Sequence, residues 1–461
     1  MLNYFLELPE TVAAKQNIDK DLKSGQVTFT INLTPDLQDL IEETLGIKVA
    51  SIPLRWIKGD TKPHIDQGAI KFDKTYLAYI TDSPGSFVIG QESYAMRQGT
   101  AFIFDEGLYH ETINTGLEPR LLLGPMSEAG VAVGASGINI SGPSGFFAYI
   151  KQESGTVYYS YDQITWTAVF SWPIFVSNSD LTPTSTFNIN FTSNISVFGT
   201  AQHFIISSNY VQIGIRELSA TGTITVDGVT GYPGLVQNSF SYSNVNVFNL
   251  MVSSINGSTL ASGCGWVAGN YYARNGATSN YIINCYSDGD ISDNSGGIVG
   301  DYAAENGGSL TVIGCSSVGQ IGGVLSGGIV GQYAGYIGGI VTVQSCWSSG
   351  ELVADAVGGI VGAFGINVDI SNCYSIGSIN GPNAGGILGS NSGSGSATIT
   401  GCYSIGAIAG GNAGGICGSF NPTLGETDTV VISNCYTMGD VEHAITNSNG
   451  GIAGLLLVGT W

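Results

Sequence analysis

Hydrophobic and polar residues alternate in short runs through the first quarter of the chain. The run at 26–33 has the period of a strand. Residues 34–45 are predicted to form a helix, with Thr34 as cap, Pro35 at the first helical position and Gly46 as its stop. Short strands are predicted after it at 49–56, 63–66, 74–80, 85–90, 101–104 and 121–123. This spacing is typical of a small β-sandwich or barrel.

The middle of the chain keeps the strand-like alternation but changes in composition. Residues 129–143 are rich in Gly, Ala and Ser, and we interpret them as a linker that follows an N-terminal domain at 1–128. Between 144 and 260, alternating runs such as 187–191 and 223–226 predict a β-rich connector and the start of a solenoid.

The last 200 residues, 261–461, repeat two short elements at intervals of 27 to 36 residues. One element is Asn-Cys-Tyr-Ser-Asp-Gly at 284–289, and the other is Gly-Gly-Ile-Val-Gly at 296–300. A period near 30 residues with short β-branched runs and turn glycines is typical of one β-solenoid coil per repeat. The segment 440–461 is expected to cap the solenoid or to form a contact surface.

Six of the eight cysteines recur once per repeat, at Cys285, Cys315, Cys346, Cys373, Cys402 and Cys435. Since no Cys-x-x-Cys pair occurs, neither zinc ligation nor a disulfide framework is the natural interpretation. We expect the cysteines to stack as an inward ladder of small apolar side chains. The glycines are expected to supply corners with positive φ and to allow coils to approach closely.

Charge separates the two halves and limits the partners. Of 14 Lys and Arg residues, 11 precede residue 125, and the formal net charge is -21. A chain this acidic lacks the clustered cations that phosphate contacts require, so nucleic-acid binding is not expected. The N-terminus lacks the pattern of a signal peptide, which indicates cytoplasmic synthesis, and no apolar run is long enough to insert into a membrane.

Four residues between 63 and 120 carry the candidate chemistry. A strand with His64 and Asp66 puts an imidazole and a carboxylate on the same face, because side chains two apart share a face. His110 is the only other histidine in the first 200 residues, and Arg120 follows ten residues later. Two histidines and one carboxylate are the ligand set of non-heme Fe(II) oxygenases. His203 and His443 have no such partners, and we interpret both as structural or exposed.

The order and spacing of these residues resemble the 2-oxoglutarate/Fe(II)-dependent dioxygenases of the prolyl- and aspartyl-hydroxylase type. The resemblance covers about residues 45–128 and rests on Leu-Arg-Trp-Ile-Lys-Gly at 54–59, Pro-His-Ile-Asp at 63–66, Thr-Tyr-Leu-Ala-Tyr-Ile at 75–80, Gly-Thr-Ala-Phe-Ile-Phe at 99–104, His110 and Arg120. It implies a double-stranded β-helix, or jelly roll, for the head. The predicted fold class is therefore mainly all-β, with this head followed by the β-solenoid.

The resemblance also implies roles for individual residues. His64, Asp66 and His110 would hold Fe(II), and Arg120 would form a two-pronged salt bridge with the distal carboxylate of the cosubstrate 2-oxoglutarate. Tyr79 is a weaker candidate for a hydroxyl contact to the same carboxylate. The implied reaction is oxidative decarboxylation of 2-oxoglutarate coupled to hydroxylation of a substrate.

The repeats resemble the glycine-rich GLUG repeats of bacterial surface proteins and similar β-helical repeats of giant-virus proteins, over roughly residues 200–455. This second resemblance implies an extended adhesive scaffold or one at a virion or particle surface. An open coil edge invites pairing, so a trimer, a fibre or a particle-surface assembly is compatible with the sequence.

Three functional hypotheses follow. The leading one is an Fe(II)/2-oxoglutarate-dependent hydroxylase fused to a surface-displayed solenoid, acting on a protein or a surface glycan. The alternative is a structural virion, fibre or adhesion protein whose oxygenase-like head is inactive or serves recognition. A third, a carbohydrate-processing enzyme on the solenoid, would need clustered acids, and Asp288, Asp290 and Asp293 come closest.

Overall fold

The computed structural model divides into two units, residues 1–137 and 138–461, and each is described by itself. The structure describes residues 2–19, 25–61, 64–67, 73–90, 92–105, 108, 110–128, 134–136, 138–169, 172–180, 182–215, 223–390, 396–419, 429–441 and 449–454. Two predicted features, His443 and the apolar end at 455–458, lie outside these ranges.

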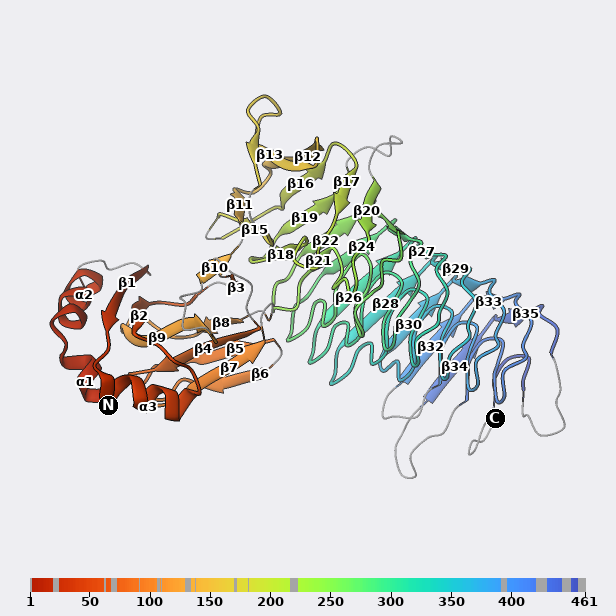
Figure 1. The fold of residues 1–461 in the computed structure, drawn as a ribbon. Helices are drawn as coiled ribbons and strands as arrows, with labels where there is room; N and C mark the ends of the chain where they lie inside the picture. Colours follow the sequence, from red (N-terminus) through yellow and green to blue (C-terminus); the bar gives the residue numbers. More distant parts are fainter. Residues whose placement is uncertain are drawn as a thin grey trace. The chain divides into compact units, whose positions relative to one another are not determined.

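The N-terminal unit, called the head below, begins with helices and continues as a β-structure (Figure 1). Its helices are α1 Leu2–Glu7, α2 Pro9–Asp19 and α3 Pro35–Leu45. Its strands are β1 Gly25–Asn32, β2 Ser51–Lys58, β3 Ile65–Gln67, β4 Lys74–Tyr79, β5 Ser86–Ile89, β6 Glu92–Ala95, β7 Ala101–Asp105, β8 His110–Ile113, β9 Arg120–Ser127 and β10 Gly134–Ser136.

Two antiparallel sheets form the body of the head. The larger has the order β1-β2-β9-β4-β7, the smaller has the order β6-β5-β8, and β3 pairs with β10. On one face of the larger sheet, side chains such as Leu54 and Trp56 pack with Phe5 and Ile41 from the helices. The other face forms a separate aromatic core that also includes Phe87 from the smaller sheet. The head is thus a two-layered β-structure with helices on one outer face.

Local sequence signals place α3 correctly. Thr34 takes an extended conformation before the helix, Pro35 begins it, and Gly46 ends it with φ 74°. Helices α1 and α2 were not predicted. They are fixed by tertiary contacts, since the Trp56 indole of β2 donates to the carbonyl of Thr11 in α2 at 3.0 Å.

The C-terminal unit is a β-solenoid, which confirms the predicted fold class. Its largest sheet has 12 strands, of which the last ten in the order below run parallel. These strands are β14 Thr167–Ala168, β13 Thr156–Ser160, β12 Phe147–Glu153, β16 Phe187–Phe191, β19 Val211–Gly214, β22 Val245–Phe248, β24 Asn280–Ile283, β26 Ser309–Ile313, β28 Ile340–Gln344, β30 Val368–Ser371, β32 Ser396–Thr400 and β34 Thr429–Ser433.

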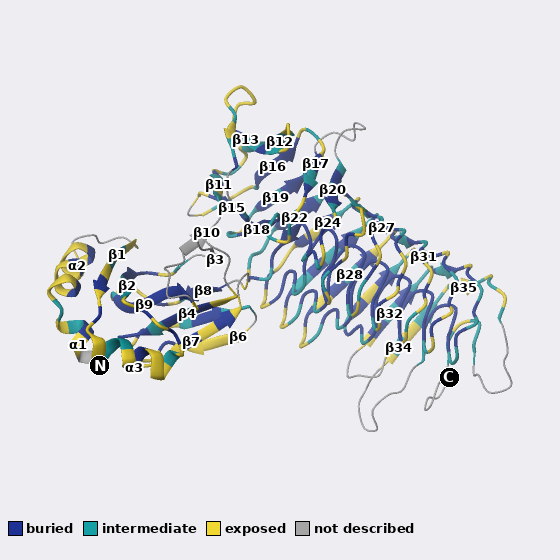
Figure 2. Ribbon diagram, in the orientation of Figure 1, coloured by how far each residue is buried: buried dark blue, intermediate teal, exposed yellow. Residues whose placement is uncertain are grey.

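Two further parallel sheets complete the coils. The nine-stranded one contains β17 Ile195–Val197, β20 Thr223–Asp227, β23 Met251–Ile255, β25 Tyr286–Ser287, β27 Ser316–Ser317, β29 Trp347–Ser348, β31 Tyr374–Ser375, β33 Tyr403–Ser404 and β35 Tyr436–Thr437. The four-stranded one contains β11 Ile138–Gly142, β15 Ile174–Asn178, β18 Phe204–Ile206 and β21 Val236–Gln237. One continuous buried core runs through the coils, as the dark interior in Figure 2 shows.

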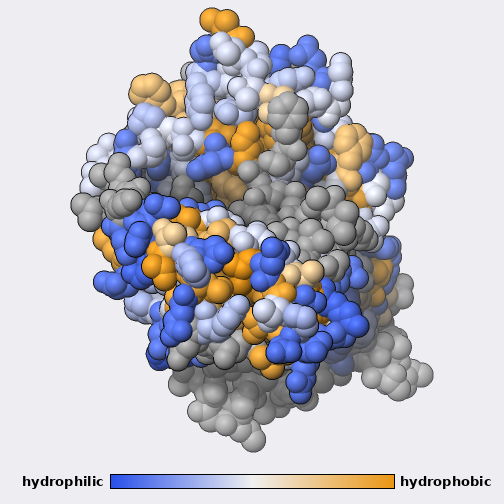
Figure 3. All heavy atoms as spheres, turned by 60° about the vertical axis from the view of Figure 1, so that its left-hand side comes forward, coloured by the Kyte–Doolittle hydropathy of each residue, from blue (hydrophilic) through white to orange (hydrophobic). Residues whose placement is uncertain are grey.

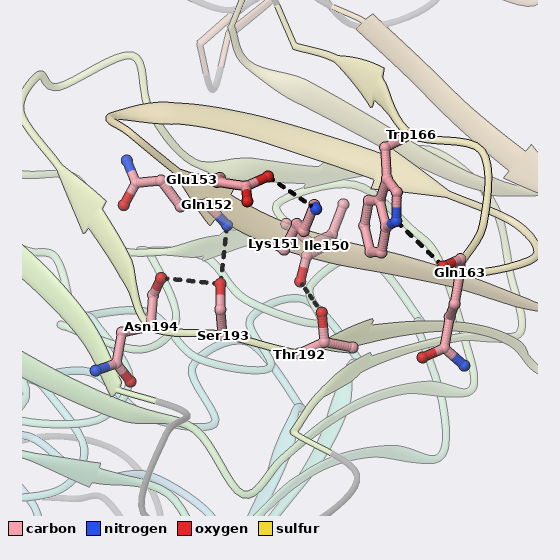
Figure 4. Close-up of polar contacts among 9 residues, drawn as sticks. All are labelled: Ile150, Lys151, Gln152, Glu153, Gln163, Trp166, Thr192, Ser193 and Asn194. Atoms are coloured by element: carbon pink, nitrogen blue, oxygen red, sulfur yellow. Dashed lines mark hydrogen bonds and ion pairs between the residues drawn. The ribbon is translucent and has the colours of Figure 1, made fainter.

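An antiparallel hairpin covers the first coil. Strand β13 folds back on β12, and Lys151 of β12 lies 4.5 Å from the centre of the Trp166 ring while its ammonium contacts Glu153 at 3.0 Å (Figure 4). The Thr192 hydroxyl donates to the carbonyl of Ile150, which ties the hairpin to the next coil. Because antiparallel pairing stops the parallel stack, the hairpin protects the edge of the solenoid that it covers.

The cysteines form the predicted ladder. In each pair of neighbouring coils, the backbone N–H of one cysteine donates to the sulfur of the next at 3.3–3.4 Å, from Cys285 to Cys435. All eight cysteines are free thiols. The adjacent outward position is aromatic in most coils, and the rings of Tyr374 and Tyr403 stack 4.9 Å apart.

Both roles expected for the repeat glycines are found, but in different glycines. Pairs such as Gly327-Gly328 allow close approach, since a Cβ on Gly328 would lie 2.0 Å from the carbonyl oxygen of Gly359 in the next coil. These paired glycines, however, do not have positive φ. Single glycines do hold left-handed corners, as at Gly314 and Gly401 with φ 63° and 65°, and asparagine holds the equivalent corner at Asn284 and Asn372.

Two further observations concern membrane-spanning helices and the hydropathy of the surface. Within the described residues, no helix has the length and hydropathy needed to cross a membrane. Hydrophilic and hydrophobic residues are intermixed on the face shown in Figure 3.

Candidate metal centre

A backbone pairing in the head joins the two predicted histidine ligands. His64 and His110 form an isolated antiparallel bridge, in which each N–H donates to the carbonyl of the other at 3.1 and 2.9 Å. Directly opposed residues in such a pair bring their side chains together. The two imidazole rings accordingly lie with their centres 4.2 Å apart.

Asp66 lies in β3, two residues beyond His64, and is only 2% exposed. Its carboxylate oxygens are 3.3 Å from His110 Nε2 and 3.9 Å from His64 Nε2. Neither oxygen has a well-aligned hydrogen bond. Burial alone would raise the pKa of Asp66, but close contact with His110 and the charges of His64 and Arg55 lower it below its usual value. The carboxylate is therefore held ionised in a buried position.

The orientation of His110 is set by its surroundings. It begins β8 in the smaller sheet, and its Nδ1 lies 3.1 Å from the carbonyl oxygen of Leu108. Its ring packs edge-on to Phe87 at 5.7 Å and against Phe104 at 4.8 Å. A hydrogen bond at Nδ1 fixes the tautomer that leaves Nε2 free as a ligand, as is common for metal-binding histidines.

Arg120 begins β9 and is fully buried in the head. Its Nη1 donates to the carbonyl of Gly59 at 2.9 Å, and its Nη2 donates to the Thr112 hydroxyl at 2.7 Å. Its Nε has no hydrogen-bond partner. Burial lowers the pKa of Arg120, opposed by the neighbouring Tyr79 and Asp60. The guanidinium is thus anchored by two contacts and retains unused N–H groups.

Tyr79 is also fully buried, and it occupies the face of β4 that belongs to the aromatic core. Burial raises the pKa of its hydroxyl, and the nearby Arg120 opposes that rise. The hydroxyl has no aligned hydrogen-bond partner. Tyr79 and Arg120 therefore place an unsatisfied hydroxyl and an unsatisfied guanidinium N–H side by side, and both could serve an anionic group.

Arg55 was missed as a candidate residue. It lies on β2, on the same face as Ile57 and two positions from it, and that face carries the aromatic core around Tyr79. Its charge acts on Asp66, and burial lowers the pKa of Arg55. The sequence did contain a signal, because Arg55 is the one charged residue within the apolar segment 52–56, which is predicted to be a strand.

The residues present fit a transition metal. Ligand atoms from His64, Asp66 and His110 all lie within 4.8 Å of one another, and no other group of His, Cys, Asp and Glu in the described residues converges in this way. Ligands about 2.1 Å from one metal ion at right angles would be about 3 Å apart, so small side-chain movements would suffice. A buried carboxylate without donors and two imidazoles are the donor set preferred by non-heme iron.

The acids proposed for a solenoid active site are used structurally. Asp288 accepts from the Ser254 N–H at 2.7 Å, Asp290 from the Gln320 N–H at 3.0 Å, and Asp293 from the Val324 N–H at 2.9 Å. Each carboxylate therefore holds a neighbouring coil. His203 is 3% exposed, its Nδ1 lies 2.9 Å from the Thr200 carbonyl oxygen, and burial lowers its pKa to about 4, as expected for a structural histidine.

Comparisons with known proteins bear on the head. Residues 22–125 match the model of the aspartyl/asparaginyl β-hydroxylase family. A search of curated proteins found no match. The crystal structure of the Agl-KA catalytic domain aligns over 94% of this chain and 96% of its own, at 9% identity, but the TM-score of 0.21 is too low to carry an argument. The family match covers a limited part of the chain, and it supports a hydroxylase-type domain in the N-terminal unit.

Proposed function

We propose that the head is an Fe(II)- and 2-oxoglutarate-dependent hydroxylase fused to a β-solenoid scaffold. The observation that carries the proposal is the convergence of His64, Asp66 and His110, with the fully buried Arg120 on the same domain. The family match over residues 22–125 supports it independently. A protein side chain or a surface glycan is the proposed substrate class.

Each residue has a proposed task. His64, Asp66 and His110 would hold Fe(II) on one side and leave other coordination positions open. Arg120 would bind the distal carboxylate of 2-oxoglutarate through its unused N–H groups, with the Tyr79 hydroxyl as a second donor. Bound iron and 2-oxoglutarate supply the oxidising chemistry that hydroxylates the substrate, and the protein orients them.

Thr112 has a positioning task in this proposal. Its hydroxyl accepts from Arg120 Nη2 at 2.7 Å and from the Thr61 N–H at 2.8 Å. These contacts link β8, which carries His110, to the guanidinium of β9. The metal ligands and the carboxylate-binding group are therefore held by one hydrogen-bonded unit.

The test is Fe(II) binding and succinate release by the full chain with 2-oxoglutarate. We expect the wild type to bind iron and to decarboxylate 2-oxoglutarate, and we expect Asp66→Asn and His110→Ala to lose both. Asp105→Asn is the matched control, because Asp105 is an exposed carboxylate that pairs with Lys74 in the same domain. Failure of the wild type to bind iron would overturn the proposal.

The alternative is a structural virion, fibre or adhesion protein with an inactive head. The size of the solenoid favours it, since that unit spans 138–461. Iron binding without succinate release, across a panel of reducing conditions, would support this alternative. It would also separate the metal site from catalysis.

A further inference from the structure

A groove is present on the outer face of the 12-stranded sheet. It lies over β19, β22 and β24, has a volume of about 430 Å³, and is lined by Gln212, Asn246, Phe248, Asn249, Tyr281 and Ile283 together with Asn284. We call it the amide groove. Its size falls within the range of about 300–1,000 Å³ that is usual for ligand sites.

The strand register arranges the groove in two rows. Gln212, Asn246 and Tyr281 are paired across the three strands in one row, and Gly214, Phe248 and Ile283 in the next. The residues between them, such as Ile213 and Val247, are fully buried in the core. Since side chains alternate along a strand, both rows face outward.

Gly214 makes room for the apolar floor of the amide groove. A Cβ at Gly214 would lie 2.6 Å from Cδ1 and 2.8 Å from Cε1 of the Phe248 ring. The ring therefore lies over the backbone of β19. Neither Phe248 nor Tyr281 stacks on another aromatic ring of the described chain, in contrast to Tyr374 and Tyr403, whose faces cover each other.

The polar groups of the groove are neutral amides and a phenol. Asn246 Oδ1 is buried and accepts no hydrogen bond. A buried acceptor without a partner costs about 1–3 kcal/mol. None of the described residues that line the groove carries a charge. The groove thus offers hydrogen bonds and apolar surface but nothing to balance an ionic ligand.

The same positions lose these features in later coils. The row of Tyr281 continues as Thr311, Thr342 and Asp369, which are small or acidic. Toward the start of the solenoid the row does keep such side chains, since Gln212 pairs with Asn188 and Asn188 pairs with Phe147, so the amide and aromatic residues of this row end at Tyr281.

We propose that the amide groove binds a short neutral oligosaccharide. A sugar ring presents C–H groups that pack on an aromatic surface and hydroxyls that both donate to and accept from amides. Phe248 and Tyr281 supply the first kind of contact, and Gln212 and Asn246 supply the second. This site is separate from the proposed chemistry of the head.

Calorimetric titration of the full chain with cellotetraose, maltotetraose, mannotetraose and N-acetylchitotetraose tests the proposal. We expect at least one to bind, and we expect Asn246→Ala and Tyr281→Ala each to weaken that binding about tenfold, the loss of one good contact. Thr342→Ala, two coils along the same row, is the matched control and should bind within about twofold of wild type. His110→Ala should bind the sugar unchanged, whether or not the head is an enzyme.

Hydrogen exchange with the bound sugar locates the site without relying on variants. Protection is expected in peptides that contain 245–249 and 280–284. If a groove variant fails to fold, Tyr281→Phe takes its place in the titration, because this change removes only the hydroxyl. Three results would each overturn the proposal: no binding of any of these sugars at millimolar concentration, binding that the groove variants leave intact, or tighter binding of a sulfated oligosaccharide.

Discussion

The replacement Asp301→Asn should make the solenoid less sensitive to alkaline pH. Asp301 is 8% exposed, and one of its oxygens has no hydrogen-bond partner. Burial raises its pKa to about 8, partly opposed by the amide of Gln332 and reinforced by the charge of Glu305. Among the described residues, no cation contributes to the pKa of Asp301, so its ionised form is not balanced by a positive charge.

The size and sign of the effect follow from proton linkage. The pKa of Asp301 rises from 3.8 to about 8 on folding, so between these values the folded state holds a proton that the unfolded state has released. Stability must then fall as pH rises through this window and level off above it. At about 1.36 kcal/mol for each pKa unit, the upper bound is about 6 kcal/mol, and relaxation around the charge reduces it to a few.

Unfolding of wild type and Asp301→Asn should be compared from pH 4 to pH 9 by thermal scans and by hydrogen exchange in peptides that contain 261–310. Near pH 4 the two proteins should agree, and above pH 8 the variant should be more stable by a few kcal/mol. Glu305→Gln should shift the loss of stability to lower pH, because removing this neighbouring negative charge lowers the pKa of Asp301. The unfolding transition of the head, which does not contain Asp301, is the internal control. A stability difference that does not change with pH would refute the reasoning.

Three further outcomes are expected. Gly328→Ala should destabilise the solenoid by about 1–3 kcal/mol in urea unfolding, because the added Cβ would lie 2.0 Å from a backbone oxygen. Gly322→Ala is the control and should be tolerated, since the atom nearest to its Cβ would be 3.6 Å away. In a maleimide assay at pH 8, at most the partly exposed Cys435 should react before denaturation and all 8 thiols after it, since burial raises the pKa of Cys346 and its neighbours; rapid native labelling of several thiols would contradict this. Arg120→Lys should weaken 2-oxoglutarate binding about tenfold or more in a calorimetric titration of the metal-loaded protein, because it removes the planar fork; unchanged affinity would exclude Arg120 from that role.

The features that the sequence predicted well depend on local or periodic rules. Helix α3 begins at Pro35 and ends before the left-handed Gly46, although the Thr34 side chain makes no capping hydrogen bond, and the cysteine ladder follows from a repeat that superimposes equivalent residues. The features that it missed depend on contacts between distant segments. Helices α1 and α2 are held by the sheet, and Arg55 becomes a site residue only when Asp66 is brought next to it.

For the glycine pairs, the sequence pattern was recognised correctly but was given the wrong physical reason. Periodic glycine has two physical explanations, positive φ and close approach, and the sequence does not distinguish them. The structure separates them, because Gly328 lies against the carbonyl of Gly359 while Asn372 has φ 53°. Asparagine, which tolerates positive φ, should therefore not replace a paired glycine, because any Cβ at that position would clash with the backbone of the next coil.

Backbone pairing brings the residues of the candidate metal centre together. His64 and His110 are 46 residues apart in sequence, yet two main-chain hydrogen bonds hold them opposite each other, and Asp66 follows on the same short segment. The positions of two ligands are therefore fixed by sheet formation, not by the metal. Such a site should keep its fold when the metal is removed, and bound metal should raise its stability only by mass action. Loss of activity without loss of structure is thus the expected result for a ligand variant such as His110→Ala.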